Sequence, residues 1–426
     1  MSVVSAESSA VDLAARLFSL DQELLDDSYP VYARLRDEAA VMRWGSIVAV
    51  ACYDDVKDDL RDVTNLSSVR TVGSRHQARL KALTPAQAEK MRELMATEDR
   101  WLVQSDDPFH AGVRRFVNHA FSAAAIGEMR DDIVAITDEL LDEAEGRDGS
   151  RLELVNDLAY RLPLRAVCVL LGADPQDEEK IRQWFDAIGE GLGTTYANVD
   201  EAHAALENFR AYVRAMIHKG REGVGQTNLF ASLVSTADDG TSLDEEDLVA
   251  MFVLLLFAGH EATTNLISNA VVPLLQNPDQ LEVLRTSPDL IRGSVDEFLR
   301  YCTSVHAVHR VAAKDAEIAG FEVKEGETIR LLLGSANHDP AKFDDPARLD
   351  VTRKSAKQHV GLGYGIHTCL GMWLVRLEVE VALGALLSRY EQLEIVGSTA
   401  VRPNFTLRGP ERVDLAYVRA NAPQHI

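Results

Sequence analysis

Near its end the chain reads Gly361-Leu362-Gly363-Tyr364-Gly365-Ile366-His367-Thr368-Cys369-Leu370-Gly371, with one cysteine among four glycines. Glycine allows the backbone to turn at positive φ and to approach a flat ligand closely. A long apolar pattern, typical of a helix, follows the cysteine directly. An isolated buried cysteine is usually an inert core residue. The pattern around Cys369 therefore matters more than the thiol itself.

This stretch resembles the haem-binding loop of the cytochrome P-450 family, which is written Phe-Gly-x-Gly-x-His-x-Cys-x-Gly. Five positions match that pattern: Gly363, Gly365, His367, Cys369 and Gly371. The resemblance implies that Cys369 is the thiolate ligand of a haem b iron, a ligand that favours cleavage of the O–O bond. It also implies that Gly363 and Gly371 lie beside the haem. Leu362 replaces the family's phenylalanine, and we expect this change to alter the iron potential.

The composition favours a soluble intracellular protein. Of the 426 residues, 46% are hydrophobic and 26% are charged, which is typical of a large globular chain. The net charge of −23 disfavours binding to nucleic acid or to an anionic membrane, because both would repel it. The four cysteines form no C-x-x-C pair, so no zinc ribbon or disulfide framework is indicated. We expect a cytoplasmic location.

The N-terminus lacks the basic and apolar parts of a signal sequence. The longest uninterrupted apolar run covers the 12 residues 248–259, whereas a membrane span needs about 20. We therefore expect no membrane span, with residues 1–20 forming a disordered tail.

Most of the chain has the periodicity of amphipathic helices. Helices are predicted over 29–40, 53–62, 84–96, 125–145, 158–171, 177–189, 199–220 and 248–269. The predicted strands are few, over 40–51, 316–323, 327–333 and 406–417. Because no repeat or linker divides the chain, we expect residues 1–426 to form one mainly helical domain with a small β portion. In the resemblance, the long stretch 63–104 contains a segment that covers the substrate.

The apolar helix predicted over 248–269 contains an unusual polar interruption. It follows Ser242-Leu243-Asp244-Glu245, the pattern of a capping box. Glycine inside a helix costs about 1 kcal/mol relative to alanine, so Gly259 needs an explanation. The pattern alone is equally compatible with a core helix that emerges into solvent. The resemblance implies instead that Ala258 and Gly259 leave room for dioxygen, while Glu261 relays protons.

One residue departs from the family at this place. The family's relay threonine directly follows the acid, but here Ala262 follows Glu261. Thr263 is rotated by about 100° around the helix axis and does not simply replace it. We expect water or a substrate hydroxyl to complete the relay. A metalloprotease site is excluded because the second histidine of H-E-x-x-H is replaced by Thr264.

Glu297 and Arg300 are three residues apart and can pair on one helix face. Several other Glu-x-x-Arg pairs occur in the chain, and a solvated helix pair explains most of them. The order of the motifs distinguishes Glu297, which lies between the polar helix and the Cys369 stretch. The resemblance implies that Glu297, Arg300 and Arg348 form a structural network behind the haem that holds the Cys369 loop.

The two haem propionates need cationic partners, and arginine forms the stronger class of such bonds. The segment Asp107-Pro108-x-His110-x-x-x-Arg114 resembles the family's propionate-binding helix start. The resemblance adds Arg310 and His367. A solvated surface residue would explain Arg310 in isolation, but the four positions together favour propionate binding.

No dinucleotide-binding or Walker motif appears, so electrons must come from another protein. We expect a ferredoxin or flavodoxin with its reductase. A basic face containing Arg115, Lys357 and Arg376 would attract such an acidic partner. A generic solvated face explains these three residues nearly as well.

The resemblance covers nearly the whole chain. It implies a haem-thiolate monooxygenase that uses O2 to hydroxylate or epoxidise an apolar small molecule. The expected substrate contacts are Phe257, Ala258, Ala262, Val305, Ala307 and Phe405. Two alternatives remain. One is a peroxide-driven peroxygenase or coupling enzyme on the same fold, suggested by Ala262 and Leu362. The other is a non-catalytic haem sensor, which the presence of Glu261 and Gly259 disfavours.

Overall fold

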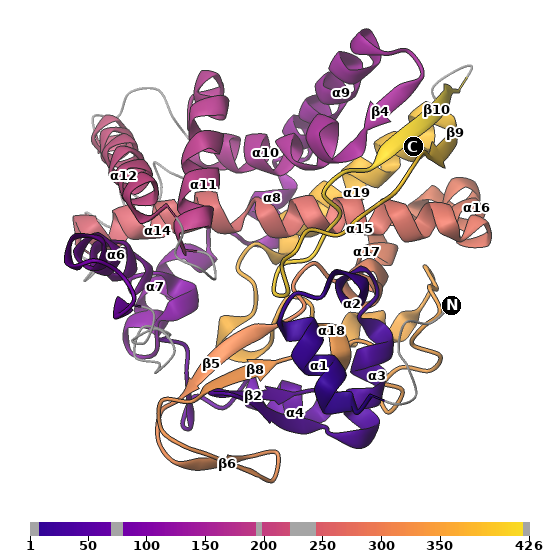
Figure 1. Cartoon of the computed structure of the whole chain (residues 1–426). Coiled ribbons are helices and arrows are strands. Elements are labelled where there is room, and N and C mark those ends of the chain that lie inside the picture. Colours follow the sequence, from indigo (N-terminus) through magenta and orange to yellow (C-terminus); the bar gives the residue numbers. More distant parts are fainter. Residues whose placement is uncertain (1–7, 70–79, 193–197, 222–243, 421–426) are drawn as a thin grey trace.

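The computed structural model describes residues 8–69, 80–192, 198–221 and 244–420. Helices dominate this part of the chain (Figure 1), as the sequence predicted. Their bounds are α1 (Ala10–Phe18), α2 (Gln22–Asp26), α3 (Tyr29–Glu38), α4 (Tyr53–Asp59), α6 (Pro85–Glu98), α7 (Phe109–Asn118), α8 (Ala123–Gly127), α9 (Arg130–Arg147), α10 (Arg161–Leu171), α11 (Glu178–Leu192), α12 (Val199–Arg221), α14 (Glu245–Ala258), α15 (Glu261–Gln276), α16 (Pro278–Thr286), α17 (Ile291–Tyr301), α18 (Leu333–Ala336) and α19 (Met372–Arg389).

The strands form one larger sheet and two small ones. They are β1 (Val41–Trp44), β2 (Ile47–Val50), β3 (Leu66–Ser67), β4 (Arg151–Glu153), β5 (Val308–Ala312), β6 (Ala316–Ile318), β7 (Phe321–Val323), β8 (Thr328–Leu331), β9 (Tyr390–Ile395) and β10 (Asp414–Arg419). The five-stranded sheet has the order β1-β2-β8-β5-β3, the second sheet has the order β4-β10-β9, and β6 pairs with β7.

Two stretches predicted as single strands are hairpins. Residues 40–51 contain β1 and β2, which pair antiparallel with Val41 opposite Val50. Gly45 makes the turn at a φ of 60°, a conformation that glycine adopts at little cost. Residues 316–323 are the β6–β7 hairpin. Extended structure was predicted correctly in both stretches, but the tight turn within each one was missed.

The expected N-terminal tail is wrong for the part that the structure describes. Helix α1 begins after Ser9, whose side chain accepts a hydrogen bond from the amide of Asp12. Leu13, Ala14 and Leu17 of this helix are buried. They pack in an N-terminal core cluster together with α2 and α3. The amphipathic spacing of these apolar residues is the signal that sequence analysis passed over.

Three hydrophobic clusters hold the protein together. The largest lies among the helices from α6 to α19, the second joins α1–α3 to the chain near residues 307, 332 and 405, and the third underlies the larger sheet. In Figure 1 the N-terminal helices and this sheet occupy the lower part, while α14 and α15 cross the middle of the molecule. Helices α14 and α15 therefore lie at the centre of the largest cluster.

The helix predicted over 248–269 is two helices, α14 and α15, separated at Gly259 and His260. The side chains of Asp244 and Asp247 form the capping box at its start; Ser242, expected to cap it, lies outside the described residues. The segment Glu245–Gln276 is long and apolar enough to cross a membrane, but 72% of its most apolar window is buried inside the protein. This is the pattern of a core helix.

Candidate active site

The loop before α19 positions the Cys369 thiol by backbone hydrogen bonds. The amide of Cys369 donates to the carbonyl of Leu362 at 2.8 Å, and the amide of Gly363 donates to Val360 at 2.9 Å. Gly363 and Gly365 have φ values of 71° and 76°, where a residue with a Cβ atom would be strained. The glycines therefore close the loop, and Cys369 stands where the loop meets the helix.

Two opposing influences act on the thiol of Cys369. Burial raises the pKa of the Cys369 thiol, while the amide of Gly371 and the positive charges of Arg114 and Arg376 act in the opposite direction. A thiol that coordinates a metal ion loses its proton outright. Among the described residues no group of three His, Cys, Asp or Glu side chains could hold a metal ion. A site built on this thiolate thus takes its other ligands from a prosthetic group.

Four predicted propionate residues lie together. The rings of His110 and His367 are 4.3 Å apart between centroids. Burial, with the charges of Arg310 and Arg114 nearby, lowers the pKa of His367 to about 3. The Nε2 atom of His110 is buried without a hydrogen-bond partner. Within the described ranges Arg114 forms no ion pair with a carboxylate, although it is half-buried.

Arg114, half-buried without a carboxylate partner in the described ranges, and the orphaned buried Nε2 atom of His110 require an anionic partner. Two carboxylates from one bound molecule meet that requirement. The residues present therefore fit haem b, with Cys369 as the iron ligand and with Arg114, Arg310, His110 and His367 as propionate partners.

The end of α14 opens onto a space. Residues 248–256 are all buried, whereas Ala258 is exposed. Gly259 has a different role from the one expected. A Cβ atom on it would lie 3.3 Å from Cγ2 of Val167 and 3.0 Å from the carbonyl of Leu255. Its small size is thus required by the close packing of α14 against α10, and Ala258 is the residue that borders the open space.

Glu261 is the first residue of α15. Burial raises the pKa of its carboxyl group, Arg402 acts against this rise and Asp186 adds to it. The hydroxyl of Thr263 donates to the carbonyl of Gly259 at 3.3 Å. It is therefore engaged with the backbone and does not replace the hydroxyl that is missing at Ala262.

The Glu297 network lies behind the loop, but with a different arginine. Arg300 donates twice to Glu297, both times at 2.8 Å, and Arg353 donates to it at 3.2 Å. The prediction of Arg348 is wrong for the side chain. Only the carbonyl of Arg348 takes part, accepting from Arg300 at 3.3 Å and from Arg353 at 3.0 Å. Asp345 has a φ of 43°, and its carbonyl accepts from the amide of Arg348 at 3.1 Å.

Asn337 connects this network to the loop. Its carbonyl accepts from Arg300 at 3.0 Å, and its side-chain oxygen accepts from the amide of Val360 at 2.8 Å. Asn337 could not be assigned this role from the sequence, because a residue pattern does not show which backbone amide a side chain will meet. Glu297 therefore acts on Cys369 through Asn337 and the loop backbone.

Two predicted substrate contacts lie elsewhere. Ala307 is fully buried and Phe405 is 5% exposed, and both belong to the N-terminal core cluster. The ring of Phe405 packs on Phe18 with centroids 4.9 Å apart. Side chains that line an open pocket would be accessible, so these two assignments are wrong. Val305, which forms an isolated β-bridge with Leu407, is half-buried.

Phe257 and Ala262 are half-buried beside the open end of α14. The ring of Phe257 lies 5.8 Å from that of Trp101 and 5.9 Å from that of Phe185, measured between centroids. Trp101 and Phe185 were missed, because nothing in their local sequence marks them. Phe257 therefore presents apolar surface on this side of the site, and the buried rings of Trp101 and Phe185 pack against it.

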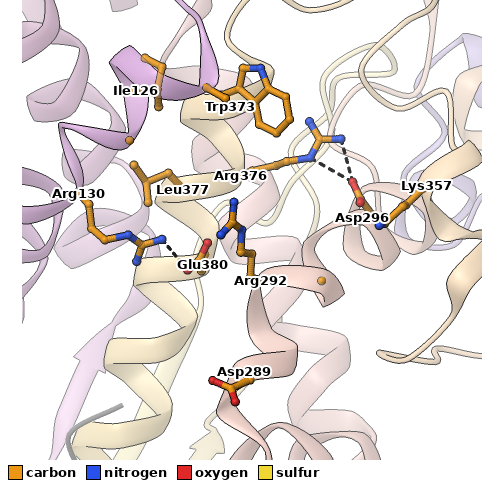
Figure 2. Close-up of a pocket in the computed structure, with 13 residues that line it drawn as sticks. Ile126, Arg130, Asp289, Arg292, Asp296, Lys357, Trp373, Arg376, Leu377 and Glu380 are labelled. Carbon is orange, nitrogen blue, oxygen red and sulfur yellow. Dashed lines mark hydrogen bonds and ion pairs between the residues drawn. The ribbon is translucent and has the colours of Figure 1, made fainter.

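The expected basic face is a groove, shown in Figure 2, of about 600 Å³. Lys357 and Arg376 line it, but Arg115 does not. Arg376 pairs with Asp296 at 2.8 Å and Arg130 pairs with Glu380 at 2.7 Å. Trp373 is 40% exposed at the rim. The groove therefore combines cations, acids and an aromatic ring.

A half-buried cysteine at the end of a glycine loop, near Arg114 and an orphaned histidine nitrogen, is the arrangement expected of a haem-thiolate protein. Comparison with known proteins gives the family. The chain belongs to the cytochrome P450 family, whose model matches residues 62–409. It is a monooxygenase by class, an oxidoreductase that uses haem b.

Curated relatives span nearly the whole chain. Cytochrome P450 107B1 of Saccharopolyspora erythraea is 34% identical over 388 residues, covering 90% of this chain and 92% of the relative. The monooxygenase PikC of Streptomyces venezuelae is 32% identical, with coverages of 95% and 94%. Vitamin D(3) 25-hydroxylase of Pseudonocardia autotrophica is 32% identical, with coverages of 90% and 92%.

Solved structures agree in fold. P450BioI, in complex with an acyl carrier protein that carries hexadec-9Z-enoic acid, superposes with a TM-score of 0.83 at 29% identity and covers 93% of this chain and 99% of its own. CYP109E1 from Bacillus megaterium, bound to testosterone, has a TM-score of 0.80 at 28% identity, with coverages of 94% and 100%. The mainly helical single domain predicted from the sequence is confirmed.

Proposed function

We propose that this protein inserts one oxygen atom from O2 into an apolar small organic molecule, by hydroxylation or epoxidation. The observation that carries the proposal is the position of Cys369, whose amide donates to the carbonyl of Leu362, near Arg114, for which the described ranges hold no carboxylate partner. When bound, haem supplies the activation of O2, and a thiolate ligand favours O–O cleavage. The residues of the chain orient the substrate, exclude water and deliver protons.

The chain orients the substrate and excludes water at the end of α14. The ring of Phe257, packed against Trp101 and Phe185, provides apolar surface, and the small side chain of Ala258 leaves space next to it. Expelling water strengthens the electrostatic interactions that remain in a site. We infer that this apolar surface selects apolar substrates, and Phe257, Ala258 and Ala262 contact them.

Glu261 is the proton donor in this proposal. Its raised pKa makes the carboxyl group hold a proton more readily than an ordinary glutamate, which suits it to proton transfer. The neighbouring Asp186 accepts a hydrogen bond from the hydroxyl of Tyr160 at 3.4 Å. Because Thr263 is engaged with the backbone, an ordered water or a substrate hydroxyl completes the transfer beside Ala262.

The names of several relatives support a large apolar substrate. They include a vitamin D(3) hydroxylase and a polyketide biosynthesis enzyme. We propose that the present chain takes a substrate of comparable apolar character. We also propose a cytoplasmic enzyme that receives two electrons from an acidic ferredoxin or flavodoxin, for which the groove with Lys357 and Arg376 provides positive charge.

A spectrum tests the core of this proposal. The reduced, carbon-monoxide-treated protein should show the red-shifted Soret band of thiolate ligation, and Cys369→Ser should abolish it. Turnover is then measured with ferredoxin, its reductase and a panel of sterols, fatty acids and polyketides. A product that contains one oxygen atom from ¹⁸O2 supports the proposal. Absence of the band in fully haem-loaded protein would refute it, and a bound but unreacted panel would favour a sensor.

One observation supports a second candidate. Ala262 lacks the relay hydroxyl, and a peroxide-driven peroxygenase or coupling enzyme does not need the same proton delivery. Comparing turnover with hydrogen peroxide against turnover with O2 and ferredoxin separates the two. Faster product formation with peroxide at equal haem content would favour the peroxygenase.

A further inference from the structure

A chain of side chains leads from the groove of Figure 2 to the start of the Cys369 loop. Arg376, at the surface, donates to Asp296 at 3.1 Å through Nε and at 2.8 Å through Nη2. Asp296 lies 3.4 Å from Nε2 of His359. On its other side, Nδ1 of His359 accepts a hydrogen bond from the amide of Gly361 at 3.1 Å. Exposure falls along this path, from 21% for the Arg376 side chain to 3% for His359.

The bond to Gly361 determines the protonation state of His359. An imidazole nitrogen that accepts from an N–H carries no proton of its own. The neutral ring therefore has its proton on Nε2, facing Asp296. If His359 gained a second proton, Nδ1 would become a donor and would face the Gly361 amide donor. The loop bond would then be lost.

Gly361 has little freedom to adapt to such a loss. A Cβ atom at this position would lie 2.5 Å from the carbonyl of Leu299 and 2.8 Å from the hydroxyl of Thr303, so the backbone is closely packed. The next residue, Leu362, supplies the carbonyl that accepts from the Cys369 amide. A displacement at Gly361 is thus one residue away from the hydrogen bond that positions the cysteine.

We propose that Asp296 and His359 are positioning residues for the haem ligand, and that Arg376 keeps His359 in the neutral form that holds the Cys369 loop. This inference rests on the proposed haem-thiolate function. Arg376 offsets the negative charge of Asp296, which would otherwise favour the imidazolium. The groups that face His359 are Asp296 and Arg300 from α17, and Arg376 from α19.

Electrostatics agrees with the geometry. Burial lowers the pKa of His359, Asp296 acts in the opposite direction, and Arg376 and Arg300 add to the lowering. An opposite charge within about 4–6 Å shifts a pKa by roughly one unit or more. The neutral ring therefore predominates at pH 7, and acid would protonate it and release the loop.

Two substitutions at position 359 compare a side chain that still accepts a hydrogen bond from the Gly361 amide with one that does not. In His359→Asn the amide oxygen occupies the place of Nδ1 and still accepts from Gly361, but it cannot be protonated. In His359→Gln the amide group lies near the place of Nε2 and the acceptor is lost. The readout is the thiolate Soret band of the reduced carbon-monoxide complex of the holoenzyme, followed from pH 8 to pH 4.5. Circular dichroism at each pH identifies global unfolding.

We expect the wild type to lose the band reversibly in acid, the Asn variant to keep it to a pH lower by about one unit, and the Gln variant to show a several-fold weaker band at pH 7. Asp296→Asn should move the wild-type transition to lower pH, and Arg376→Gln should move it to higher pH. In the His359→Asn background, Arg376→Gln should not move it.

The inference is overturned if the Asn and Gln variants have the same curve, or if Asp296→Asn and Arg376→Gln shift the transition in the same direction. A wild type without a thiolate band at pH 8 would instead overturn the proposed haem-thiolate function, and this inference with it. The two failures are thereby distinguishable.

Discussion

Glu297 of α17 and Glu378 of α19 are two buried glutamates on neighbouring helices, and their surroundings differ in whether the carboxyl group has hydrogen-bond partners. Both are fully buried. Glu297 accepts hydrogen bonds from Arg300, from Arg353 and from the amide of Asp350. Neither oxygen of Glu378 has a hydrogen-bond partner among the described residues, and burial raises its pKa well above the usual value. One carboxyl group is buried with basic partners, and the other is buried without any, where burial favours its protonated form.

The difference follows from what surrounds each group. Glu297 lies where Arg300, Arg353 and the carbonyls of Asn337 and Arg348 meet, so its charge is needed to balance buried cations. Glu378 lies on a helix whose buried neighbours are apolar, including Leu374, Val381 and Ala382. Glu297 connects α17 to the segment that contains Asp350 and Arg353, whereas Glu378 makes no such connection among the described residues. The first should be costly to remove and the second should not.

Glu297→Gln is expected to have the largest effect. It leaves two buried guanidinium groups without their carboxylate, and breaking a buried pair costs about 3–5 kcal/mol. Urea unfolding followed by circular dichroism measures this loss. The matched control is Glu89→Gln in the exposed pair with Arg92, which should change stability by less than about 0.5 kcal/mol. Equal effects at both positions would contradict the network.

Arg353→Ala and Arg348→Ala sharpen the assignment of the network. Arg353 binds Glu297 and the carbonyl of Arg348, so its loss should cost about 1–3 kcal/mol. The carbonyl of Arg348 survives its own substitution, and that variant should lose less than about 0.5 kcal/mol. Chemical unfolding and the carbon-monoxide spectrum compare them. A larger effect of Arg348→Ala would restore the original sequence prediction.

Glu378→Gln should increase the stability of the protein at high pH, whereas most substitutions of buried residues decrease stability. The folded protein holds a proton on Glu378 at pH values where the unfolded chain has released it, so stability falls as the pH rises above about 4.3, by up to about 1.4 kcal/mol per unit. The glutamine variant lacks this fall and should be the more stable form in alkali. Melting temperatures between pH 5 and pH 9 test this, with exposed Glu391→Gln as the control. Parallel curves for wild type and variant would mean that Glu378 is ionised.

The smallest effect is expected from Ala262→Thr, next to the half-buried Glu261. If Glu261 and water already complete proton delivery, an added hydroxyl should change the ratio of product to electrons consumed by less than about twofold, which is below 0.5 kcal/mol. NADH consumption and product formation measure this coupling with the native substrate. A several-fold gain would show that the native relay is incomplete.

Sequence reasoning succeeded where the residues concerned belong to short sequence motifs. The Cys369 loop and the cluster of His110, Arg114 and His367 appear in the structure as the motifs implied. It failed where a residue acts through space. Arg353 lies five positions after Arg348 and is equally basic, and no local pattern reveals which side chain points at Glu297. Likewise, Phe405 packs on Phe18 of a helix nearly 400 residues earlier, a contact that no short motif contains.

The helix break illustrates the same limit. The apolar run of 248–259 marked a buried helix and Gly259 marked an irregularity, but packing against Val167 of α10 determines what that glycine does. Trp101 and Phe185 contact Phe257 only because α11 and the segment before α7 meet the end of α14.

By itself the amino-acid sequence predicted the family and the helical class, which the comparisons confirm, and it led to the proposed iron ligand and propionate set, because each depends on residue types at short, regular spacings. Only the tertiary structure decided which arginine binds Glu297, why Gly259 is a glycine, which predicted pocket residues are core, and how Arg376 reaches His359. Those outcomes depend on distances between residues far apart in the chain, and packing determines such distances once all the elements are in place.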